Sequence, residues 1–136
     1  MQQGIIEKNH MDILWHDYAL NKEDTIPITK AGLIEKASVV GRCGMMLLSC
    51  GTGAWRVRSS MNTLSRELGI TCTADIGLMS IEYTCFDGEN CFSQSLCLTN
   101  TGVNTSKLNR LENFINDFPT KEKYLSGEQI HSYLDE

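Results

Sequence analysis

The chain has 136 residues, of which 41% are hydrophobic and 21% charged, a composition typical of a globular domain rather than a disordered segment. Its net charge is -5 and its 12 lysine and arginine residues are scattered, which excludes the basic footprint of a nucleic-acid-binding protein. No stretch approaches the roughly 18 apolar residues of a membrane-spanning helix, and the N-terminus lacks the features of a signal peptide, so we expect a cytosolic chain.

The six cysteines lie inside periodic segments, where a free thiol behaves as a small buried hydrophobe. Reduced thiols are expected without a signal peptide, although Cys85 and Cys91 could face each other across a tight hairpin. No Cys-x-x-Cys pair occurs, and we therefore expect neither a zinc site nor a cofactor.

Residues 1–26 are predicted to be an N-terminal extension, and residues 27–136 the main domain. The first nine residues look loose. The spacing of a short helix follows at Ile13, Leu14, Asp17 and Tyr18.

A long helix is predicted from about Ile28 to Cys50, because Pro27 suits a first helical turn and apolar residues then recur at three- and four-residue steps. This stripe consists of Ile34, Ala37, Gly41, Met45 and Leu48. Several of its members are small, as are the nearby Ala31, Ser38 and Gly44. The stripe would therefore let another helix approach closely.

A second helix is predicted after Gly51, which suits a left-handed helix end, and Thr52, which can cap a new helix. Its apolar seam consists of Ala54, Val57, Met61, Leu64 and Leu68, and Gly69 ends it. The two helices form a helical hairpin.

The pattern then alternates, which predicts three antiparallel strands with one buried face. The first spans residues 71–76, and Asp87-Gly88 predicts the turn between the second and third. The apolar positions of the second strand are Met79, Ile81, Tyr83 and Cys85. Those of the third are Phe92, Leu96 and Leu98, with Gln94 as the polar exception.

Two helices close the chain. The first carries Leu108, Leu111, Ile115 and Phe118 and stops at Pro119, and the second opens with a capping box from Ser126 to Gln129. It has no stop signal, which favours a sequence that continues past Glu136. The predicted fold is α+β: a helical hairpin packed on a three-stranded antiparallel sheet and closed by two C-terminal helices.

The start of the second helix is a candidate ligand site. Amide groups near Gly51 and Thr52, with Arg56 one turn further, would suit a carboxylate. This turn is not a dinucleotide-binding motif, because Arg56 replaces the third glycine and a helix precedes it.

Asp75 is a second candidate, since it closes a strand among apolar neighbours. It either faces water as a turn residue or converges with Glu82 and Arg56 to bind a polar ligand. No metal pair is predicted, because His10 and His16 lack same-face helical spacing.

Cys50 is a weak candidate nucleophile, because the helix start just beyond it could lower its pKa. A nucleophile needs a base, and the histidines His10, His16 and His131 all occur in peripheral segments. The favoured interpretation of Cys50 is a packed small residue at a helix end.

The segment from Leu47 to Met61, followed by Leu64 and Leu68-Gly69-Ile70, resembles the N-terminal domain of the threonine/serine exporter family. The hallmark of that family runs approximately Leu-Leu-x-Ser-Gly-Ala, then aromatic-Arg-Val-Glu, then Met and Ala-Leu-Gly. The resemblance covers roughly residues 28–136. The chain departs from the family where Cys50 replaces a usual Ser, Gly53 a polar or acidic residue, and Arg58 a common Glu.

The resemblance implies a soluble accessory or regulatory domain at the cytoplasmic face of a bacterial membrane, preceding a membrane region that exports threonine and serine. Its implied partners are its own C-terminal transmembrane region or a partner membrane subunit, with an amino acid as a possible ligand. Two alternatives stay open. One is a hydrolase-like domain acting on peptides or amino-acid derivatives through Cys50, which the departures disfavour. The other is an oligomerisation module that pairs through the small-residue stripe.

Overall fold

The sheet is built from the three segments whose side chains alternate. In the computed structural model, which describes residues 7–9, 13–18, 27–98, 102, 104–121 and 124–135, these strands are consecutive and antiparallel. They are β2 (Thr71–Ile76), β3 (Ser80–Phe86) and β4 (Cys91–Cys97). One face of the sheet is buried and is contacted by α1 (Leu33–Ser49) and α2 (Ala54–Leu68), so the predicted α+β class with three antiparallel strands is confirmed.

The turn between β3 and β4 forms as Asp87-Gly88 predicts. One carboxylate oxygen of Asp87 accepts hydrogen bonds from the amides of Glu89 and Asn90, at 2.9 and 2.8 Å. Gly88 has a φ of 102°, a backbone conformation that residues with a Cβ atom rarely adopt. The carboxylate and the glycine together fix the register of the hairpin.

A fourth strand was not predicted. Residues that looked loose in the sequence include β1 (Glu7–Asn9), which pairs in parallel with β4 and gives the sheet the order β1-β4-β3-β2. This pairing uses backbone groups over only three residues, and so it leaves no alternation of apolar side chains for a sequence pattern to reveal.

The long first helix begins later than predicted. A short 3-10 helix, η3 (Ile28–Lys30), is followed by extended backbone at Ala31 and Gly32, and α1 (Leu33–Ser49) starts only there. The amide of Ile28 donates to the carbonyl of Leu125 at 2.7 Å, which ties η3 to the C-terminal region. Ile34 was also placed wrongly in the buried stripe, since it is 46% exposed.

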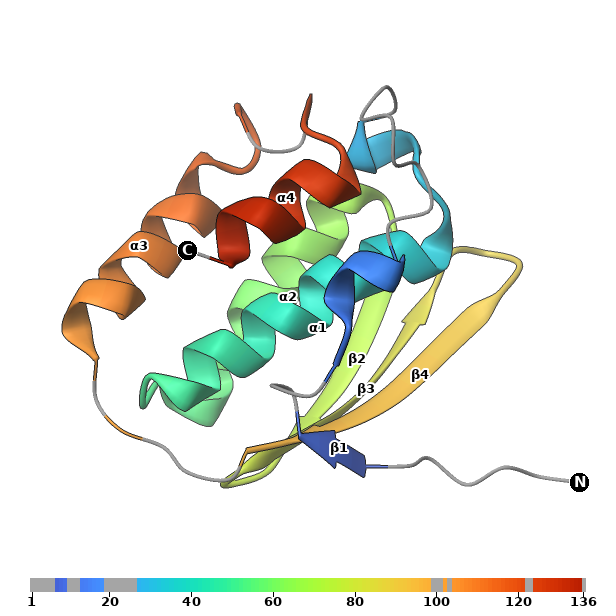
Figure 1. Ribbon diagram of the computed structural model, residues 1–136. Helices are drawn as coiled ribbons and strands as arrows, with labels where there is room; N and C mark the ends of the chain where they lie inside the picture. The colour runs from blue at the N-terminus through green and yellow to red at the C-terminus, as the bar shows by residue number, and fades with distance from the viewer. Residues whose placement is uncertain are drawn as a thin grey trace, which may run out of the picture.

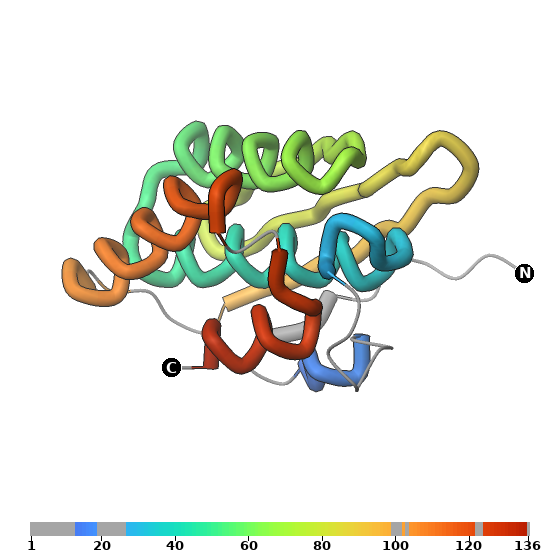
Figure 2. Tube along the Cα trace, turned by 90° about the horizontal axis from the view of Figure 1, so that it is seen from above, coloured from blue at the N-terminus to red at the C-terminus, as the bar shows by residue number. Residues whose placement is uncertain are grey.

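Helix α1 runs through the middle of the molecule (Figure 1). It contacts β3 and β4 on one side, and it also contacts α2 (Ala54–Leu68), α3 (Thr105–Asp117) and α4 (Gly127–Leu134). Seen from above, α2 lies on one flank of α1, and α4 lies on the other flank beside the 3-10 helix η2 (Trp15–Tyr18) (Figure 2). The described helices include none long and apolar enough to cross a bilayer.

The small residues of α1 are covered inside the domain. Gly41 lies against the ring of Tyr83, and Gly44 lies against the side chain of Met61 on α2. Ala37 is fully buried as well. The stripe is thus already occupied by the sheet and by α2, so it is not open to a second copy of the chain. Association through another surface stays a prediction.

The turn between α1 and α2 confirms one cap and corrects another. Gly51 has a φ of 93° and Gly69 has a φ of 75°, as expected for residues that end helices. Thr52, however, does not cap α2. The N-cap is Gly53, which offers no side chain to the first helical amides.

The two closing helices form as predicted. Asn104 caps α3 by accepting from the amide of Lys107, and Ser126 and Gln129 form a complete capping box at the start of α4. The polar exception on the inner face of β4 is also explained. Gln94 accepts from the hydroxyl of Tyr83 at 2.8 Å and donates to the hydroxyl of Tyr18 at 3.1 Å, so its amide joins η2 to the sheet.

Candidate functional site

The predicted carboxylate site lies at an open cavity of about 470 Å³ between the α1–α2 turn and the β2–β3 connection. Gly51 and Thr52 both line it. The other lining residues are Leu48, Gly53, Ala54, Ile76, Gly77 and Leu78. We call this space the turn pocket. The structure therefore gives two of the predicted ligand residues a cavity, although their role as ligands stays a prediction.

The remaining predicted ligand residues do not converge there. Arg56 forms an exposed ion pair with Glu112 of α3 at 3.3 Å. Asp75 and Glu82 lie opposite each other on β2 and β3, and both are exposed on the outer face of the sheet, away from the helices. Arg56 and the two carboxylates therefore do not build one site.

Cys50 packs in the core at the end of α1 and is 2% exposed. His131 of α4 contacts Ser38 and Arg42, which lie well before Cys50 along α1. Arg42 precedes Cys50 by two helical turns, about 12 Å along the axis. The described histidines thus provide no base at Cys50, and His10 lies outside the described residues.

A polar network that the sequence did not predict surrounds His131. The hydroxyl of Ser38 donates to the carbonyl of Glu35 at 2.6 Å and lies 2.9 Å from Nε2 of His131. Because the hydroxyl proton is already committed, Nε2 must donate to Ser38. Nδ1 then accepts from Nη1 of Arg42 at 3.2 Å, and Arg42 also donates to the His131 carbonyl at 3.1 Å.

This arrangement holds His131 neutral. The side chain is fully buried, and burial together with the charges of Arg42 and His16 lowers its pKa to about 3. The pair of Ser38 and His131 is therefore structural rather than nucleophilic, because the histidine donates to the serine oxygen instead of accepting its proton.

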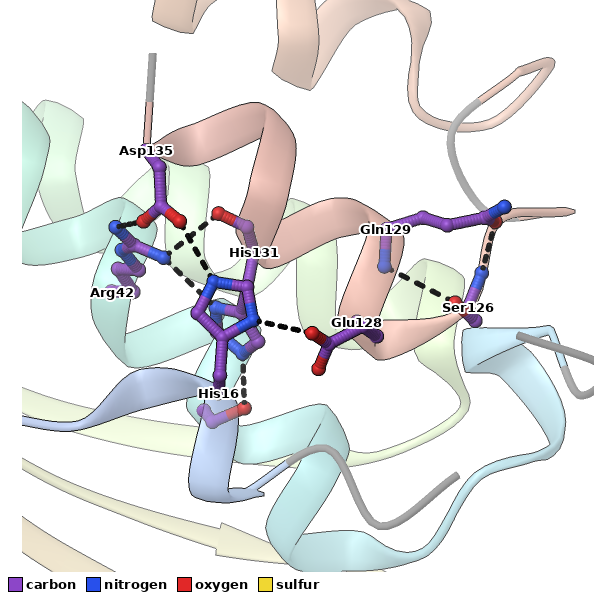
Figure 3. Close-up of polar contacts among 8 residues, drawn as sticks. His16, Arg42, Ser126, Glu128, Gln129, His131 and Asp135 are labelled. Carbon is purple, nitrogen blue, oxygen red and sulfur yellow. Dashed lines mark hydrogen bonds and ion pairs between the residues drawn. The ribbon is translucent and has the colours of Figure 1, made fainter. Parts of the chain in front are cut away.

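The network continues to the protein surface through Asp135. Arg42 pairs with one of its carboxylate oxygens, and Nε2 of His16 lies 2.7 Å from the other. Nδ1 of His16 lies 3.0 Å from Glu128. Figure 3 shows His16, Arg42, His131 and Asp135 meeting beside α4, with the capping box at the start of the same helix.

The charges of this cluster stabilise one another. The hydrogen bond to Asp135 is the main reason that the pKa of His16 is raised, and the carboxylate of Glu128 adds to it. Burial alone would raise the pKa of Asp135, but hydrogen bonds from Arg42 and His16 outweigh it and lower that pKa. At neutral pH the carboxylate of Asp135 is ionised, and it favours the protonated form of His16.

An open cleft of about 430 Å³ lies over this network. We call it the polar cleft. Its charged or titratable lining residues are His16, Asp17, Arg42, Lys107 and Asp135. Its apolar lining is Ile13, Leu14, Trp15, Met46 and Leu134. Neither Lys107 nor Asp17 forms an ion pair with another described residue, so each brings a free charge to the cleft.

Trp15 forms part of the wall of the polar cleft. Its ring is stacked on His131 at 6.1 Å between centroids, and the guanidinium of Arg42 lies 5.9 Å from it. The described residues contain no group of three or more histidine, cysteine or acidic side chains placed to hold a metal ion. The arrangement is suited to binding a small polar molecule with charges of both signs.

Comparison with known proteins places these elements in a family. A family model described as "Putative threonine/serine exporter" matches residues 38–136. No curated protein and no solved structure matches the chain. The matched range contains most of α1 and all of α2, α3 and α4, whereas η2 precedes it.

Proposed function

The chain belongs to the threonine/serine exporter family, and on that premise we propose that it is an accessory, regulatory domain of a bacterial membrane transporter that exports threonine and serine. In this proposal the domain lies at the cytoplasmic face of the membrane, and the translocation path belongs to a membrane region outside these 136 residues. The observation that carries the proposal is the family match, which includes three of the elements that line the polar cleft.

The regulatory step in this proposal is the binding of an amino acid in the polar cleft. A free amino acid carries an ammonium and a carboxylate on neighbouring atoms, and the cleft offers charges of both signs. Lys107 and Arg42 suit the carboxylate, while Asp17 and Asp135 suit the ammonium. The cleft therefore has the charge pattern that a zwitterion needs.

Binding there has a direct route to the packing of the domain. The walls of the cleft come from η2, α1, α3 and α4, so one ligand contacts elements that are far apart in the sequence. A ligand that binds Lys107 and Asp135 together favours the arrangement in which α3 and α4 are close. Such a preference is what a regulatory domain requires in order to report substrate to a membrane region.

Calorimetric titration of L-threonine and L-serine into the chain tests the proposal. We expect both to bind, and L-threoninol, which lacks the carboxylate, to bind at least about tenfold more weakly. The variant Lys107→Ala should lose affinity for the amino acids to a similar extent. Lys121→Ala removes a lysine that is exposed and outside the cleft, and it is the matched control.

Either of two results would contradict the proposal. One is the absence of binding at millimolar L-threonine. The other is an equal affinity of the Lys107→Ala and Lys121→Ala variants, because the cleft would then not be the binding site.

A further inference from the structure

We infer that the turn pocket is a second binding site, selective for a small carboxylate with an aliphatic body. The pocket is formed by the end of α1, the α1–α2 turn and the β2–β3 connection, whereas the polar cleft is lined by η2, α3, α4 and an earlier part of α1. The inference is independent of the proposed function, since the two sites share no lining residue.

The first observation is the uncapped start of α2. Its N-cap, Gly53, makes no side-chain hydrogen bond to the helix. The amides of Ala54 and Trp55 have no acceptor among the described residues. The first hydrogen-bonded amides of α2 are those of Arg56 and Val57, which both donate to the carbonyl of Gly53. Free amides at the positive end of a 15-residue helix favour an anion.

The second observation is the hydroxyl of Thr52. Thr52 lines the pocket and is only 8% exposed, yet its Oγ1 has no hydrogen-bond partner in the described part of the chain. A buried hydroxyl without a partner is unfavourable by about 1–3 kcal/mol. A carboxylate bound at the free amides would lie beside Thr52, and rotation of this side chain into the pocket would let its hydroxyl donate to the ligand.

The composition of the lining selects the kind of anion. Leu48, Ile76 and Leu78 supply aliphatic surface beside the donors, and Leu78 is 90% exposed. No residue that lines the pocket is acidic or basic. An ammonium group would find no counterion among these residues, so an aliphatic carboxylate fits better than an amino acid.

Titration of the ¹⁵N-labelled chain with butanoate, followed by amide chemical shifts, tests the inference. Saturable shifts should appear first at Gly53, Ala54 and Trp55. Butanamide, the neutral analogue of the same shape, should bind at least about tenfold more weakly, because the charge-assisted hydrogen bonds are absent. Inorganic phosphate should also bind more weakly, because it lacks the aliphatic body.

Two threonine variants complete the experiment. Thr52→Val keeps the side-chain shape and removes the hydroxyl, and it should weaken butanoate binding by about tenfold. Thr73→Val makes the same chemical change on the exposed face of β2 and should leave the affinity unchanged. Unchanged amide shifts elsewhere would show that Thr52→Val is folded. The inference is overturned if butanoate shifts no amide of the turn, if butanamide or phosphate binds as tightly, or if both variants bind equally well.

Discussion

Gly41 of α1 lies so close to Tyr83 of β3 that a Cβ atom at position 41 would overlap the tyrosine ring and its hydroxyl. Tyr83 is itself almost fully buried, and its hydroxyl oxygen, which donates to Gln94, lies 3.1 Å from the carbonyl oxygen of Ala37. The glycine therefore sets how closely the central helix approaches the sheet, since Tyr83 has no free space into which to move.

Alanine substitutions at three glycines should differ in their effect on stability. Gly41→Ala should lower the free energy of unfolding by at least about 2 kcal/mol, because either the backbone of α1 or the ring of Tyr83 must shift to make room for the new Cβ atom. Gly44→Ala should have a smaller effect, since its Cβ would meet the flexible side chain of Met61. A Cβ atom at position 32 would meet nothing within 4 Å, so Gly32→Ala should change the free energy of unfolding by no more than about 1 kcal/mol. Urea unfolding measures all three, and equal values for Gly41→Ala and Gly32→Ala would contradict the packing described.

The thiols should react in the order of their exposure. Cys91 is exposed, whereas burial raises the pKa of Cys43 to about 12. Cys85 lies opposite Phe92 while Cys91 lies opposite Phe86, so their side chains point to different faces of the sheet and do not pair. Alkylation of the folded chain followed by mass spectrometry should label Cys91 first and find no bridge between Cys85 and Cys91. Early labelling of Cys43 would show that the core is open.

His131 should make the domain sensitive to acid. In the folded state the pKa of His131 is held at about 3, whereas in the unfolded chain His131 binds a proton near the ordinary histidine pKa of 6.5. The unfolded state therefore binds more protons below pH 6.5, and stability falls as the pH drops, by up to about 1.4 kcal/mol per pH unit. The raised pKa of His16 has the opposite effect on stability. Its stabilising contribution is fully present below pH 6.5 and is lost only as the pH rises above that value.

Urea unfolding between pH 6.5 and 4.5 measures this effect before most carboxylates titrate. The variant His131→Gln retains a donor toward Ser38 and removes the titration, so its stability should depend less steeply on pH in this range. Identical slopes for the variant and the parent chain would mean that His131 does not stay neutral in the folded state.

Removing the hydroxyl of Thr52 should stabilise the domain in the absence of ligand. Oγ1 of Thr52 is buried without a partner among the described residues, so Thr52→Val should raise the free energy of unfolding by about 1 kcal/mol. Thr73→Val on the exposed face of β2 is the control, with an expected change of no more than about 0.5 kcal/mol. A loss of stability in Thr52→Val would show that the hydroxyl has a partner within the protein.

The regular elements could be predicted because each repeats its pattern over several turns or pleats. The seam of α2 and the alternation of β3 contain enough apolar positions to fix a period, and Gly69 and Gly88 follow their ends. Strand β1 could not be predicted, since it has three residues and pairs through its backbone. The break before α1 follows a segment whose Ile28 amide is bonded to Leu125, a contact between distant parts of the chain that no local pattern reveals.

The polar cleft could not be predicted for a similar reason. His16, Arg42, Lys107 and Asp135 are dispersed over more than a hundred positions, and no local spacing links them. One signal was available at His131, which follows the buried Ile130 and lies three residues before the buried Leu134. A histidine at that position is on the core face of α4, and a buried histidine requires partners.

We propose that amino-acid binding in the polar cleft regulates export of threonine and serine. The most direct measurement is threonine efflux from threonine-loaded cells that carry the complete source gene, recorded against internal threonine concentration. We predict that Lys107→Ala shifts this dependence while Lys121→Ala leaves it unchanged at equal protein levels. Efflux curves that coincide for the two variants, or an intact gene that produces no threonine efflux, would contradict the account.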